Sequence, residues 1–130
     1  MKILLASLAF ALSLSACQKD ETISGVSGPE DQWQLVRLNG EAIEVPITLT
    51  FPEKGRLAGQ APCNSYFGEQ TAPLPWFDTN AVGATRRACP EMELEGRYFK
   101  AFSEVTMVER KGDTLLLTND AGGLLEYRLQ

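Results

Sequence analysis

Short stretches in which apolar and polar residues alternate run through most of this sequence, and they restrict its fold more than any other feature. Such alternation puts every second side chain on the same face, as in a strand with one buried side. The segment 47–51 (ITLTF) is the clearest case, and 33–38 (WQLVRL) ends at Asn39-Gly40, a strong hairpin signal. Because turn residues separate about seven or eight such segments, we predict a mainly β (α+β) domain, a curved antiparallel sheet or partial barrel.

One segment departs from the two-residue period. Apolar residues recur there at three- and four-residue spacing, and they are Leu94, Tyr98, Ala101, Phe102 and Val105. This spacing places them on one face of a helix, so we predict a single α-helix near residues 90–104. Glu91, Glu93 and Glu95 would stabilise the positive end of its dipole. Residues two apart on a helix do not face each other, which argues against a catalytic carboxylate pair.

The composition excludes several kinds of active site. The 130-residue chain has no histidine, which rules out Ser-His-Asp and Cys-His pairs and zinc sites other than all-Cys or carboxylate ones. A formal net charge of -5 without a basic patch offers nucleic acid no site for counterion release. Metal motifs, Gly-rich phosphate loops and nucleophile elbows are also missing from the sequence. We therefore predict a protein that is not an enzyme and has no cofactor, no metal and no nucleic-acid partner.

The N-terminus has the pattern of an export signal. Lys2 precedes an apolar stretch, from Ile3 to about Leu14, that is shorter than the roughly 20 residues of a membrane-spanning helix. Residues 14–17 (LSAC) then resemble the bacterial lipobox, which implies cleavage after Ala16 and diacylation of Cys17. We predict a lipoprotein signal peptide over residues 1–16, with membrane attachment through Cys17. The alternative is an ordinary secretory signal followed by a chance cysteine.

Residues 17–30 are predicted to form a lipidated N-terminus and a flexible tether. They are polar, with Gly, Ser and Pro and no periodic apolar face. A flexible chain of this length spans roughly 20 Å, enough to hold a domain just off a bilayer. Gln18, rather than Asp, follows the cysteine, and by the usual sorting rule for such lipoproteins this suggests the periplasmic face of the outer membrane.

Cys63 and Cys89 remain once Cys17 is assigned to the lipid anchor. Export places both in an oxidising compartment, where two cysteines most simply form a disulfide. Two thiolates without histidine make a poor zinc site, and a nucleophilic Cys63 would lack its usual base. We predict a structural disulfide that fixes the start of the helix against the sheet. Free or redox-active thiols are the alternative.

Several motifs occur in order along the chain: Trp33-x-Leu35, CNSYFG at 63–68, TRRAC at 85–89 and EGRYFKAF at 95–102. Together they resemble the META domain, also called the HslJ-like domain, over about residues 31–130. The positions that match the family motif are Asn64, Tyr66, Gly68 and Thr85. The resemblance implies an exported β-rich domain, often lipid-anchored, without established catalytic activity. It also links the chain to proteins involved in heat shock, antibiotic tolerance, secretion or motility.

One principal function and two alternatives follow. We predict a non-enzymatic cell-envelope lipoprotein whose domain, residues 31–130, is an interaction or stress-related support module for an unknown envelope protein. One alternative is an inhibitor of an exogenous hydrolase, a lysozyme or a protease, acting through an exposed loop at 69–80. The other is a carrier that holds a small ligand in an apolar interior.

Two further groups of residues have competing interpretations. Arg86 and Arg87 are interpreted as forming local ion pairs with the glutamates that follow, the alternative being a bound phosphate or acidic partner. The large aromatic residues are interpreted as core residues, although some of them would also suit a ligand groove. They are Trp33, Tyr66, Phe67, Trp76 and Phe77.

Overall fold

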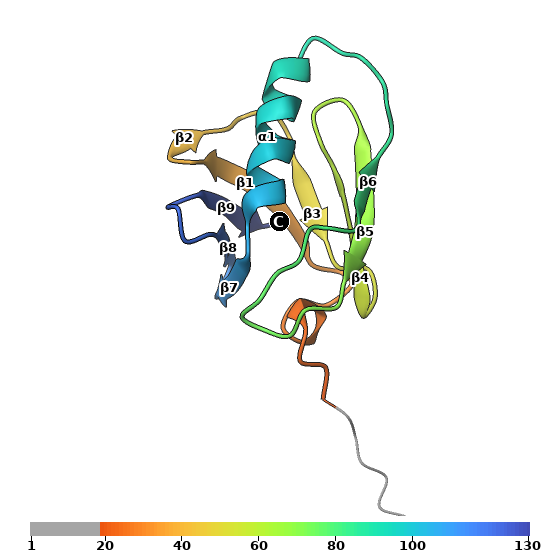
Figure 1. Cartoon of the computed structure of the whole chain (residues 1–130), viewed down its shortest axis with the longest axis vertical. Coiled ribbons are helices and arrows are strands. Elements are labelled where there is room, and N and C mark those ends of the chain that lie inside the picture. The colour runs from red at the N-terminus through yellow and green to blue at the C-terminus, as the bar shows by residue number, and fades with distance from the viewer. Residues whose placement is uncertain (1–18) are drawn as a thin grey trace, which may run out of the picture.

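The computed structural model describes residues 19–130, so the predicted signal peptide and Cys17 lie outside the described residues. A curled antiparallel sheet forms a half-barrel, and one α-helix lies across its concave side (Figure 1). The fold class predicted from the sequence is confirmed. In chain order the elements are η1 (Ile23–Gly25), β1 (Gln32–Leu38), β2 (Glu41–Ala42), β3 (Thr48–Thr50), β4 (Gly55–Gln60), β5 (Ser65–Gln70), β6 (Val82–Ala84), α1 (Met92–Glu104), β7 (Met107–Lys111), β8 (Thr114–Thr118) and β9 (Leu124–Leu129).

The strands follow one another across the sheet in the order β6-β5-β4-β3-β1-β9-β8-β7, and β2 pairs separately with β1. β1 joins the two halves of the chain, because it pairs with β3 through Trp33 and Leu49 and with β9 through Leu35 and Tyr127. The register with β9 shifts between Leu35 and Arg37. An irregularity of this kind bends a strand and increases its twist, which suits a sheet that curls.

Local sequence signals place both the first hairpin and the helix. Asn39 and Gly40 have φ angles of 49° and 87°, the left-handed values that a tight hairpin turn requires, and they join β1 to β2. α1 begins at Met92 and ends at Glu104, within the range predicted from the apolar stripe. No described helix is long and apolar enough to cross a membrane.

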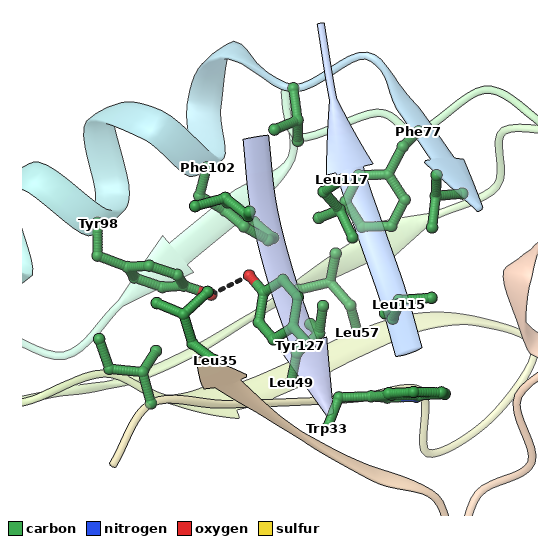
Figure 2. Close-up of a cluster of buried hydrophobic side chains, with 14 of the residues drawn as sticks. Trp33, Leu35, Leu49, Leu57, Phe77, Tyr98, Phe102, Leu115, Leu117 and Tyr127 are labelled. Carbon is green, nitrogen blue, oxygen red and sulfur yellow. Dashed lines mark hydrogen bonds between the residues drawn. The ribbon is translucent and has the colours of Figure 1, made fainter. Parts of the chain in front are cut away.

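The core lies between the concave face of the sheet and α1 (Figure 2). Strands contribute every second side chain to it, and the helix contributes one face. The buried side chains include Trp33, Leu35, Leu49, Leu57, Tyr66, Phe77, Tyr98, Phe102, Leu115, Leu117 and Tyr127. Three of the five aromatic residues interpreted as core residues are therefore buried. The other two, Phe67 and Trp76, are each 56% exposed.

Three tyrosine hydroxyls form a hydrogen-bonded chain in this core. The Tyr98 hydroxyl lies 2.8 Å from that of Tyr66 and 2.9 Å from that of Tyr127. The Tyr66 hydroxyl donates to the Thr48 carbonyl oxygen. A hydroxyl has one hydrogen, so Tyr98 must donate to Tyr66, and Tyr127 must donate to Tyr98. Burial of the three rings raises the pKa of each phenol above its ordinary value.

The chain from residue 20 to residue 30 belongs to the folded domain, which corrects the prediction of a flexible tether there. η1 buries Ile23, and the Trp33 indole N–H donates to the buried Ser27 hydroxyl at 2.9 Å. Arg110 lies over the Trp33 ring, 4.9 Å from its centroid, and pairs with Asp31 at 2.9 Å. Arg110 is 79 residues from Asp31, and the local polar composition of the segment did not reveal contacts of this kind.

Candidate functional site

Cys63 and Cys89 form a disulfide whose Cα atoms lie 5.5 Å apart. Cys63 comes just before β5, and Cys89 comes just before α1. The bridge therefore holds the first turn of the helix against the end of a strand. Both thiols are consumed by it, so neither sulfur is available as a nucleophile or a metal ligand while the bridge is intact.

Removing this bridge with Cys63→Ala/Cys89→Ala is expected to lower the free energy of unfolding by about 3.5 kcal/mol. The two cysteines are 26 residues apart in sequence, and the open loop gives the unfolded chain more conformations. Urea unfolding of the wild type and the double variant measures the difference. A Cys17→Ala variant, which keeps the bridge, serves as the control. Equal stability of the wild type and the double variant would contradict the assignment of a structural role.

Asn64 follows the bridge and uses its full hydrogen-bonding capacity. Its Oδ1 accepts from the Arg87 main-chain N–H and from the Thr85 hydroxyl, the latter at 3.0 Å. Its Nδ2 donates to the Arg87 carbonyl at 3.0 Å and to Glu95 Oε2 at 2.7 Å. The Thr85 hydroxyl also accepts from the Ser65 N–H at 3.1 Å. Two of the family-motif residues, Asn64 and Thr85, thus fasten the chain after β6 to the start of β5.

Glu95 is a central residue of this network. Its side chain projects inward from α1, and the residue is only 4% exposed. Its Oε1 accepts the main-chain N–H groups of Cys63 at 3.0 Å and Asn64 at 2.9 Å. These bonds, with the one from the Asn64 amide, satisfy donors that would otherwise be buried without partners.

Glu95 does lie in the first turn of the helix, where its charge suits the dipole, but the dipole alone does not explain it, because its carboxylate is buried against main-chain donors. Glu91 and Glu93, in contrast, are exposed. The sequence does contain a weak signal for the difference. Glu95 lies three residues after Met92 and four before Phe99, on a second helical face that turns toward β6 rather than toward the core.

The remaining two motif residues support β6 from the neighbouring strand. Tyr66 is buried and pairs with Ala84, and Gly68 pairs with Val82. A Cβ atom at Gly68 would lie 2.4 Å from the Ala81 carbonyl oxygen, closer than real Cβ atoms approach. Any side chain at this position would push β6 away from β5.

A groove of about 590 Å³ lies between β6 and the first half of α1, and we call it the β6 groove. Figure 1 shows β6 and α1, and the segment 85–91 that joins them at one end. The residues that line the β6 groove are Asn64, Val82, Gly83, Ala84, Thr85, Arg86, Arg87, Ala88, Met92, Glu95 and Phe99.

β6 is an outer strand of the sheet, and its free edge borders this groove. The Thr85 N–H donates to the Ser65 carbonyl at 3.0 Å, so Thr85 bonds toward β5. This fixes which residues of β6 bond to β5 and which lie between them. In an antiparallel ladder the intervening residues direct their main-chain groups away from the partner strand. Val82 and Ala84 therefore present N–H and C=O groups outward, and no residue within 19–130 bonds to them.

The opposite edge of the sheet is covered. The Phe77 N–H donates to the Thr106 carbonyl, and the Val108 N–H donates to the Pro75 carbonyl, each at 2.8 Å. Trp76 makes a bridge with Met107 in β7. Within the segment 69–80, considered above as an inhibitory loop, residues 75–77 are thus bonded along the start of β7 instead of projecting freely, although the Trp76 side chain remains exposed.

Arg86 and Arg87 lie exposed at one end of the β6 groove. Neither guanidinium forms an ion pair within residues 19–130, so the interpretation of local ion pairs with the following glutamates is wrong. Over the same residues, no group of three or more His, Cys, Asp or Glu side chains is placed to hold a metal ion. The groove offers main-chain, apolar and cationic groups to a partner.

The chain forms a curled antiparallel half-barrel that one helix crosses, and a disulfide and a buried carboxylate lie at the start of that helix. These features define a class of small β-rich domain. The model of the META domain family matches residues 26–130, and the chain belongs to this family. The match begins within the packed N-terminal segment, five residues before the boundary at residue 31 predicted from the sequence.

Solved structures share the fold. A protein solved by NMR is 24% identical with a TM-score of 0.62, covering 76% of this chain and 88% of its own. A protein from Burkholderia xenovorans, also solved by NMR, is 27% identical with a TM-score of 0.60, covering 77% and 81%. A crystal structure of a DUF4847 family protein from Bacteroides vulgatus is 14% identical with a TM-score of 0.51, covering 63% and 57%. No match is found among curated proteins.

Proposed function

We propose that this chain is an exported, lipid-anchored protein of the cell envelope that acts by binding another envelope component and not by catalysing a reaction. The observation that carries the proposal is the β6 groove, where a free strand edge, an apolar wall and two unpaired guanidinium groups come together. The polar groups at its base, Asn64 and Glu95, are engaged with each other and with the main chain. The groups that stay free in the groove are the strand edge, the apolar wall and the two guanidinium groups, and they are suited to binding a partner.

The two alternative functions gain less support. An inhibitor would need a rigid projecting loop, and residues 75–77, in the middle of the segment 69–80, are bonded along the start of β7. A carrier would need space inside the half-barrel, and that interior is filled by large side chains, among them Trp33, Tyr98 and Phe102.

The lipid anchor has its own test. Replacing Cys17 with Ser is expected to move the protein from the membrane fraction of lysed cells to the soluble fraction, because position 17 then has no thiol to which the lipid can be attached. Immunoblots of the two fractions, with the intact mass of the purified protein, provide the measurement. A Gln18→Asp variant is the matched control: it retains the lipid mass and is expected to shift toward the inner membrane. Identical fractionation of the wild type and Cys17→Ser would contradict the anchor.

Binding is tested by affinity capture from detergent-solubilised envelope with the lipidated full chain, followed by mass spectrometry. One protein enriched over bare resin, and also enriched with a form that lacks the lipid, would assign the interaction to the folded domain. If neither form enriches any protein, the proposed binding function is rejected.

A further inference from the structure

We propose that the β6 groove binds an extended, acidic segment of a partner protein, which adds to the sheet as a strand beside β6. The inference rests on the proposed binding function and specifies the chemistry of the partner.

The strand edge supplies the first part of the argument. Val82 and Ala84 are two residues apart, so their N–H and C=O groups point outward at the spacing that another strand would match. Proteins usually protect such an edge with a short strand, lysine, proline or a covering segment, and β6 has the first of these protections, at three residues. It contains neither lysine nor proline, however, and the covering segment of this domain lies on the opposite edge, along β7. Strand addition draws affinity from main-chain hydrogen bonds and specificity from alternate side chains.

The helix face supplies the second part. Side chains of an added strand would alternate between the outer face of the sheet and the groove. Those pointing into the groove would contact Met92 and Phe99 on α1, and Met92 is 45% exposed without a partner. The thioether side chain is adaptable, so this contact favours apolar residues of differing size. The segment therefore needs apolar residues at alternate positions.

Charge supplies the third part. The chain has 17 acidic and 12 basic side chains, yet Arg86 and Arg87 stand side by side at the end of β6 without a carboxylate partner in the described residues. Guanidinium groups bind carboxylates bidentately. The one acid lining the groove, Glu95, directs its oxygens to the N–H groups at the base. In an antiparallel segment, the residues that meet the two arginines are those at its N-terminal end. A phospholipid headgroup would satisfy the arginines but not the strand edge, which is why we propose a peptide.

The segment is identified by selection from a display library of random peptides of about nine residues, long enough to pass β6 and reach the arginines. The target is the full chain purified with its lipid. Enriched peptides are expected to carry Asp or Glu near the N-terminal end and apolar residues at alternate positions after it. Synthetic copies of them are then used to measure Kd by fluorescence anisotropy.

Two variants test the contacts separately. Ala84→Pro removes an outward N–H that β5 does not use, so it is expected to weaken peptide binding about tenfold or more while the domain stays folded. Arg86→Glu/Arg87→Glu is expected to weaken binding by a similar factor, and the main-chain bonds from Arg87 to Asn64 do not depend on its side chain. Arg128→Glu, an exposed arginine on β9 without an ion pair in the described part of the chain, is the matched control and leaves the Kd unchanged.

Hydrogen exchange gives a readout that needs no variant. Peptide binding is expected to slow exchange of the Val82 and Ala84 amides and to leave that of Gly83, which faces β5, nearly unchanged. Unchanged exchange at both outward amides overturns the inference. So does equal binding by Ala84→Pro, the absence of acidic residues from the enriched peptides, or a failure to enrich any peptide. The inference is also overturned if Arg86 and Arg87 are required for binding to phosphatidylglycerol vesicles but not for binding to the peptides.

The test of strand addition and the test of the proposed binding function can fail independently. If affinity capture retrieves the same envelope protein with the wild type and with Ala84→Pro, the binding function stands and strand addition is rejected. If capture retrieves nothing, the binding function itself is rejected.

Discussion

Glu95→Ala is expected to lower the free energy of unfolding by about 3–5 kcal/mol, a large part of the stability of a domain this size. The change removes the acceptor for two main-chain N–H groups and for the Asn64 amide, and it leaves these donors in a site where the native residue is only 4% exposed. A buried donor without a partner costs its full desolvation, about 1–3 kcal/mol each. Urea unfolding followed by circular dichroism measures the loss.

Two further substitutions give this prediction its controls. Glu93→Ala changes an exposed glutamate on the same helix and is expected to alter stability by less than about 0.5 kcal/mol. Glu95→Gln is expected to be intermediate: its carbonyl can still accept both main-chain N–H groups, but its NH₂ group then faces the donating Asn64 Nδ2. If Glu95→Ala were no more destabilising than Glu93→Ala, the carboxylate would have no structural role.

Raising the pH above about 10 is expected to unfold the domain, with all three tyrosines ionising together as it does so. The chain contains only Tyr66, Tyr98 and Tyr127, and burial raises the pKa of each phenol in the folded state. The unfolded chain therefore releases phenolic protons at a pH where the folded chain still holds them. The stabilisation is complete below the unfolded pKa and is lost as the pH rises above it. Above the unfolded pKa, each tyrosine lowers the free energy of unfolding by about 1.4 kcal/mol per pH unit, so the three together lower it by about 4 kcal/mol per pH unit.

Phenolate absorbance and circular dichroism, recorded on the same samples across the alkaline range, are the measurements. Both signals should change at one midpoint. Tyr127→Phe, which removes only the terminal donor of the hydroxyl chain, is expected to stay folded and to reduce the pH dependence by about a third. A gradual rise in phenolate absorbance near pH 10, before any loss of folded signal, would contradict the burial of the three hydroxyls.

Much of the fold could be predicted from short-range patterns, because strand and helix periodicities are local properties of the chain. The segment 33–38 forms most of β1, the segment 47–51 contains β3, and the Asn39-Gly40 turn lies where its φ preferences predicted it. The apolar stripe of α1 likewise faces the core. In the candidate site, the family resemblance identified Asn64 and Thr85. It did not reveal the hydrogen-bond partners that explain their role.

What the sequence by itself determined is the type of the main strands and of the helix, and the face that they bury, since these depend on residues a few positions apart. Only the tertiary structure decided which edge of the sheet remains open, whether Glu95 points inward and whether residues 20–30 join the core. Each depends on groups brought together from distant parts of the chain: residues 75–77 along β7, the N–H groups beside the disulfide, and Trp33 beneath Arg110. Hydrogen bonds and a cation–π contact between residues far apart in sequence make these contacts, and pairings of this kind leave no periodic trace in the sequence.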